Sequence, residues 1–163
     1  MNNLKEATLY TLQKAQSLLD QITNEQLCDK SIPPYFSSIG GHLRHVLDFY
    51  DCVLKITPDC IIDLTERSRD INVESNCDCA KSYVERITEA VSDLDNTEDM
   101  PVVVIDDLGL GKIQIPYTFG AVLAQANTHA THHFAMINYM LQNLNVVFSD
   151  ADFGYNPTTP KRN

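Results

Sequence analysis

The sequence contains no tryptophan, few basic residues and no long apolar run. Its 163 residues include 12 lysines and arginines against 22 aspartates and glutamates, and the net charge of -10 repels polyanions. No apolar stretch approaches the roughly 20 residues that a membrane-spanning helix needs, and the chain begins with the polar segment 1–6. We therefore expect a cytoplasmic protein with no nucleic-acid or membrane partner.

The cysteines also lack the pattern of a secreted, disulfide-rich domain. There are five, an odd number, and they are widely spaced. The tightest pair, Cys77 and Cys79, lacks the paired C-x-x-C spacing of a structural zinc site. Reduced thiols and ordinary helix positions are the expected interpretation.

Four segments carry apolar residues at intervals of three and four, the period of an amphipathic α-helix. They are residues 4–23, 37–56, 75–94 and 118–144. Residues 57–73 and the tail 148–162 show no sustained period, so we expect a long crossover loop and a final surface segment. The β-like runs 102–105 and 112–115 predict a hairpin before the last helix. The predicted fold is an all-α four-helix bundle with a long crossover between helices two and three and this small β-hairpin.

All five histidines lie on two of the predicted helices, the second and the last. They are His42, His45, His129, His132 and His133. On an α-helix His129 and His133 lie one turn apart on one face, so their imidazoles can share an ion. That face also carries Val122 and Met136, and it is expected to point inward, where burial favours the neutral imidazole that binds metal.

A third ligand is expected from the second helix, because two imidazoles do not complete a tetrahedral shell. His42 and His45 are three residues apart, so one can face the metal while the other flanks it. Helical periodicity places His42 nearer the middle of the apolar side and His45 towards its edge. Imidazoles suit several transition metals, and no carboxylate cluster indicates magnesium or calcium. We expect one divalent transition metal, with zinc or nickel preferred and iron as an alternative.

Two segments resemble motifs of the DinB-like (DinB/YfiT) family of metal-binding four-helix bundles. Residues 38–46 resemble its helix-two pattern, in which a histidine follows Ile-Gly by several residues, and residues 129–135 look like its helix-four motif. The resemblance implies three metal ligands, which are His45, His129 and His133. The neighbours His42 and His132 are then flanking residues or alternative ligands.

The resemblance extends over nearly the whole chain and implies a single DinB-like domain at residues 1–163, often a homodimer. Because the family includes thiol-dependent transferases, our first hypothesis is a metal-dependent thiol S-transferase with a small-molecule substrate, for instance a low-molecular-weight thiol. The nucleophile would be a metal-activated thiolate or water. The alternatives are a non-catalytic metal-binding or stress-response module, a metal-dependent hydrolase, and a bundle with structural histidines. No catalytic residue is assigned.

Three charged residues near the histidines are expected to lie outside the site. Asp48 follows His45 by one turn on the polar face of its helix, and is therefore expected to be exposed rather than to orient a ligand. Arg67 and Arg69 could bind an acidic group, but a solvated loop is the expected state of the crossover.

Overall fold

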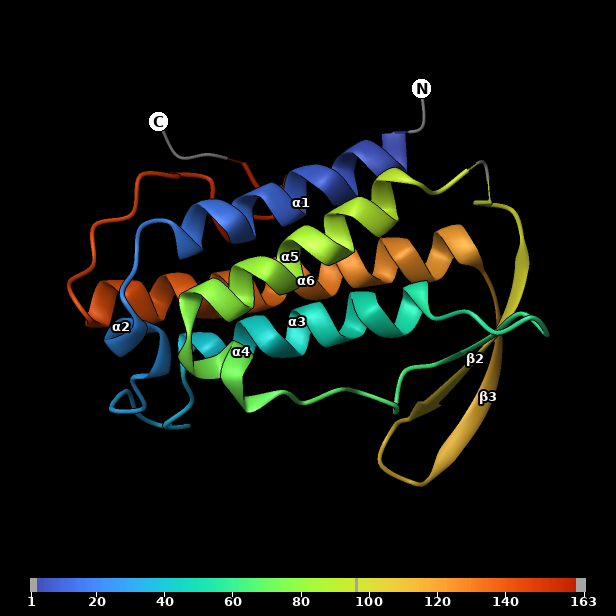
Figure 1. Ribbon diagram of the computed structural model, residues 1–163, viewed down its shortest axis with the longest axis horizontal. Coiled ribbons are helices and arrows are strands. Elements are labelled where there is room, and N and C mark those ends of the chain that lie inside the picture. Colours follow the sequence, from blue (N-terminus) through green and yellow to red (C-terminus); the bar gives the residue numbers. More distant parts are fainter. Residues whose placement is uncertain (1–2, 96, 161–163) are drawn as a thin grey trace.

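Four long helices run side by side in the computed structural model, which describes residues 3–95 and 97–160 (Figure 1). These helices are α1 (Asn3–Leu19), α3 (Ile39–Leu54), α5 (Cys77–Ser92) and α6 (Phe119–Asn143). Helix α3 contacts α5 and α6, and α1 contacts the same two helices. Among the described helices, none combines the length and the apolar character that crossing a membrane requires.

Polar side chains cap the helices on which the histidines lie. The Ser38 hydroxyl accepts a hydrogen bond from the Gly41 backbone amide at 3.0 Å, and the Thr118 hydroxyl accepts one from Ala121 at 3.2 Å. Such caps satisfy amides that have no partner within the helix. They help to determine where α3 and α6 begin.

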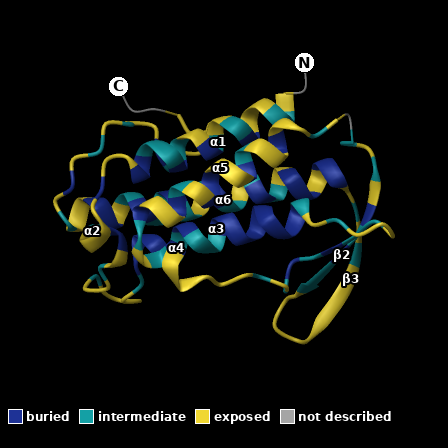
Figure 2. Ribbon diagram, viewed as in Figure 1, coloured by how far each residue is buried: buried dark blue, intermediate teal, exposed yellow. Residues whose placement is uncertain are grey.

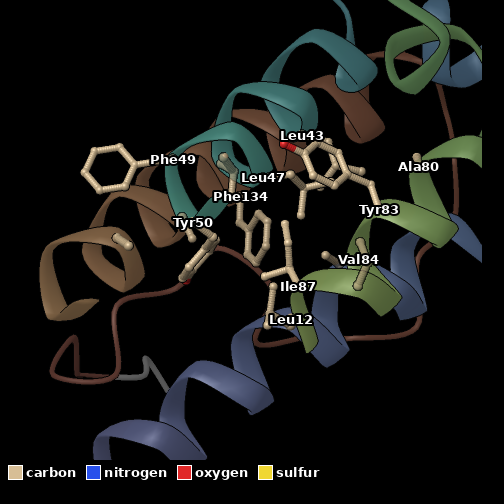
Figure 3. Close-up of a cluster of buried hydrophobic side chains, with 14 of the residues drawn as sticks. Leu12, Leu43, Leu47, Phe49, Tyr50, Ala80, Tyr83, Val84, Ile87 and Phe134 are labelled. Carbon is tan, nitrogen blue, oxygen red and sulfur yellow. The ribbon is translucent and has the colours of Figure 1, made fainter. Parts of the chain in front are cut away.

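The core lies where the four long helices meet (Figure 3). Leu12 of α1, Leu47 of α3, Ile87 of α5 and Phe134 of α6 are all buried there. Burying one such side chain stabilises the fold by about 1.5–3 kcal/mol. Residues 46–53 of α3 are all buried, as Figure 2 shows, so packing on all sides holds the polar side chains of this helix in place.

A three-stranded mixed sheet makes the predicted all-α class wrong. Strands β2 (Pro101–Asp107) and β3 (Lys112–Thr118) pair antiparallel and contain the two runs expected to form a hairpin. The third strand, β1 (Ile61–Asp63), pairs parallel with β2. Since β1 has three residues and its partner lies far along the chain, no local alternation marks it in the sequence.

Two short helices further change the predicted architecture. They are α2 (Asn24–Cys28) and α4 (Ile71–Ser75), and each is too short to show a helical period. The segment 57–73 therefore contains β1 and the start of α4 rather than only a loop. With six helices and a mixed sheet in the described residues, the protein is not a pure four-helix bundle.

The C-terminal tail packs against α6 at one buried residue. Phe153 is fully buried, and its ring stacks on that of Phe134 with centroids 4.7 Å apart. Most of its described neighbours are exposed, as expected for a surface segment. Lys161 and Arg162 of the predicted tail lie outside the described residues, as do the first two residues of the polar segment 1–6.

Candidate metal centre

His45 of α3 lies beside His129 and His133 of α6. Each offers a ring nitrogen, and these three nitrogens lie within 4.8 Å of one another. The ring centroid of His45 lies 4.8 Å from that of His129 and 4.8 Å from that of His133. The centroids of His129 and His133 are 4.5 Å apart. The structure thus brings together the three histidines implied by the resemblance, because α3 and α6 pack side by side.

One nitrogen of this group has no partner. His129 Nε2 is buried and makes no hydrogen bond in the described part of the chain. Leaving a buried polar atom unsatisfied costs about 1–3 kcal/mol, so a metal ion bound at this nitrogen would remove that cost. Ligand nitrogens lie about 2.0–2.1 Å from zinc, and two of them on a tetrahedral ion are about 3.3 Å apart. The chemistry of three imidazoles gathered within 4.8 Å of one another fits a transition metal.

The three rings are neutral at pH 7. Burial is the main cause: it lowers the pKa of His45 and His129 to about 4, and that of His133 to about 3. The positive charge of Arg67 contributes further at His45 and His129, and the neighbouring imidazoles contribute at His133. Neutral rings keep the lone pairs that coordinate a metal, as the apolar face of the last helix predicts.

His42 lies next to His133 rather than in the group of three. The Nδ1 atoms of the two rings are 2.8 Å apart, and His42 Nε2 is 2.9 Å from the Ser37 hydroxyl. If His133 donates its Nδ1 proton to His42, its Nε2 lone pair is free for a metal, and His42 donates in turn to Ser37. With this proton arrangement, His42 would orient the His133 ring towards a metal. His132 is exposed, with its ring 5.2 Å from that of His133.

Two residues that were not predicted to belong to the site contact these histidines. Arg67 is half-buried, with Nη1 3.0 Å from His45 Nδ1, so the prediction that it lies in a solvated loop is wrong. The buried ring of Phe49 lies 5.0 Å from the ring of His129 and points away from Leu47 in Figure 3. Phe49 follows His45 by one helical turn, and this spacing could have predicted that it lies beside the histidines. No local feature of the sequence predicts the same for Arg67.

Asp48 is fully buried, and the prediction that it is exposed is wrong. Its carboxylate accepts hydrogen bonds from Arg44 Nη1 at 2.9 Å, the Tyr83 hydroxyl at 3.0 Å and the Arg69 backbone amide at 3.2 Å. Helix α5 and the crossover segment cover this face of α3, which the pattern of one helix does not reveal. These donors engage Asp48 away from the histidines.

A pocket of about 370 Å³ opens beside the histidines. Its lining includes His42, His45 and His133 together with Lys30 and Arg44. Because it is large enough for a small molecule, a ligand can approach the ring nitrogens from this side.

Comparison with known proteins assigns no family to the chain. No protein-family model matches it, and no curated protein or solved structure matches it. The likeness to DinB-like proteins therefore rests on the residues of the sequence alone. The geometry of the three histidines is the observation from which a function can be inferred.

Proposed function

We propose that the protein binds one divalent transition metal on His45, His129 and His133. The observation that carries this proposal is that one ring nitrogen from each of three neutral histidines converges within 4.8 Å. His129 Nε2, which is buried and has no hydrogen-bond partner among the described residues, supports it. An all-imidazole set suits zinc, nickel or iron and does not suit magnesium or calcium. We prefer zinc or nickel.

The reaction that we propose for this centre is thiol S-transfer by a DinB-like protein. A bound ion with three protein ligands supplies an open position and a Lewis-acid charge that favours the deprotonated form of a thiol. The chain itself holds the rings neutral by burial, and Phe49 covers His129 on one side. A hydrogen-bond chain from His133 through His42 to Ser37 would place the His133 proton on Nδ1 and leave its Nε2 for the metal. The adjoining pocket accommodates the substrate.

Metal content tests the centre directly. Untagged protein is incubated with zinc or nickel, desalted and measured by mass spectrometry of the metal against protein concentration. We expect about one ion per chain for wild type and less than about a tenth of that for His129→Ala. His132→Ala is the matched control, because it removes an exposed imidazole from the same helix and should keep the ion. Wild type without stoichiometric metal would refute the proposal, as would equal losses in both variants.

A second pair of variants tests the ligand assignment on α3. His45→Ala should abolish stoichiometric binding, whereas His42→Ala should weaken the affinity about 10–100-fold and still saturate at one ion. Competition with a chromophoric chelator measures both affinities. The reverse result, with metal retained by His45→Ala and lost by His42→Ala, would show that His42 is the ligand.

The transferase proposal needs an activity measurement. Metal-loaded wild type should accelerate the conjugation of cysteine or glutathione to chlorodinitrobenzene, and His129→Ala should not. If wild type holds one ion and gives no acceleration with either thiol, the metal centre stands and transfer from these thiols is rejected.

A further inference from the structure

The guanidinium of Arg67 contacts His45 and has no carboxylate partner among the described residues. Nη1 lies 3.0 Å from His45 Nδ1, and Nε donates to the Leu64 carbonyl at 3.1 Å. Arg67 forms no ion pair with the acidic residues that the structure describes. Its charge also acts on His129. A half-buried cation thus lies where a second cation is proposed to bind.

The hydrogen bond between Arg67 and His45 is incompatible with a metal bound to His45. Arginine only donates hydrogen bonds, so His45 Nδ1 must be the acceptor, and the neutral ring then carries its proton on Nε2. A metal on Nδ1 takes the lone pair that Arg67 uses. A metal on Nε2 would require the ring proton to lie on Nδ1, and the Nδ1–H and the Arg67 N–H would then be two donors facing each other. In both cases metal binding breaks the contact between Arg67 and His45.

After its release from His45, the guanidinium carries a positive charge that no described carboxylate balances, so it can bind an anion. Its Nε remains bonded to the Leu64 carbonyl, so the group stays beside the metal, and two neighbouring cations repel. Arg44, which lines the adjoining pocket, is already paired with Asp48 and Glu74. The fork of a single arginine matches a carboxylate in geometry and charge. One guanidinium balances the single charge of a carboxylate, whereas a phosphate carries about −1.5 to −2 and would remain partly unbalanced.

We infer that Arg67 changes partner when the metal binds: it competes with the metal for His45 in the free protein, and it holds the carboxylate of a small acidic ligand in the loaded protein. This inference rests on the proposed metal centre and specifies its ligand class. Metal and carboxylate then bind with positive cooperativity, and each raises the affinity of the other by the same factor.

Zinc affinity tests the competition without reference to activity. It is measured with a chelator in carboxylate-free buffer for wild type, Arg67→Met and Arg69→Met. Arg69 is the matched control, because it lies in the same segment, its side chain is exposed, and its contact to Asp48 uses the backbone. We expect Arg67→Met to bind zinc about 10-fold more tightly than wild type, and Arg69→Met to equal wild type.

Saturating acetate, against a chloride control of equal ionic strength, tests the anion. It should tighten zinc binding about 10-fold in wild type and Arg69→Met and leave Arg67→Met unchanged. Arg67→Lys keeps the charge without the planar fork, so acetate should tighten its zinc binding less than in wild type. This variant also replaces Arg67→Met in the test if Arg67→Met does not fold.

The two proposals fail in different ways. Absence of zinc from wild type refutes the metal centre itself. If wild type binds zinc but Arg67→Met matches it in affinity and in acetate response, only the role of Arg67 is overturned. Weaker zinc binding by folded Arg67→Met would likewise overturn the competition.

Discussion

Helix α3 contributes side chains to two polar clusters that have different neighbours. In the aspartate cluster, Asp48 accepts from Arg44 and Tyr83, and Asp51 pairs with Lys55 at 2.6 Å and Arg86 at 3.0 Å. Among the described residues, the histidine cluster of His45, His129 and His133 includes a buried nitrogen without a hydrogen-bond partner, and the Arg67 guanidinium beside it has no carboxylate partner. The first cluster is satisfied by its own protein groups, whereas the second is not.

This difference separates a structural network from a candidate site. Buried carboxylates with cationic partners and hydrogen bonds hold α3 to α5 without any ligand. A buried nitrogen without a partner costs stability, and a bound ion would remove that cost. Asp48, Asp51 and His45 all lie on α3, so the contrast between the clusters arises from the segments packed around this helix rather than from its local sequence.

The largest expected effect comes from opening the aspartate cluster. Asp48→Ala leaves Tyr83 without its acceptor and Arg44 with Glu74 alone, so we expect the free energy of unfolding to fall by about 3 kcal/mol. Urea denaturation measures the change. Asp48→Asn retains an acceptor and should lose less. A stability equal to wild type in Asp48→Ala would show that this network is not structural.

Acidification should act on the histidine cluster. The folded pKa values of about 4 for His45 and His129 and about 3 for His133 lie below the value of about 6.5 expected in the unfolded chain. The stabilising contribution is therefore complete above about pH 6.5 and is lost as the pH falls towards 4, because the unfolded chain binds protons first. We expect metal-free protein to lose on the order of 1–2 kcal/mol between pH 7 and pH 5, since solvent screens the half-buried rings.

The control for this pH dependence removes the most strongly shifted ring. His133→Gln cannot titrate at that position, so its unfolding free energy should change less with pH over the same interval. Urea denaturation at several pH values makes the comparison. A slope as steep as that of wild type would exclude His133 as a source of the effect.

The smallest effect is expected at the exposed edge of the aspartate cluster. The Arg86 side chain is 58% exposed, and Asp51 keeps Lys55 when Arg86 is replaced. Arg86→Met should therefore lower the free energy of unfolding by less than about 1 kcal/mol. Thermal and urea denaturation check this value. A loss as large as that of Asp48→Ala would mean that the exposed pair, rather than the buried network, holds α3 to α5.

Sequence reasoning was effective where a signal is local. The one-turn spacing of His129 and His133 predicts a shared face, and the cap at Ser38 lies close to the expected start of the second helix. It failed where the partner is remote. Strand β1 pairs with β2 across a long separation in the chain, and the exposure of Asp48 depends on Tyr83 of another helix.

The sequence by itself determined the amphipathic helices, the β-hairpin and the two groups of histidines, because these follow from residue types at short spacings. Helical periodicity favoured His42 and the resemblance implied His45; the tertiary structure places His45 with His129 and His133, and it alone shows that Arg67 reaches His45. Those outcomes depend on the packing of α3 against α6 and on the path of the crossover. Both are decided by contacts between segments that lie far apart in the chain.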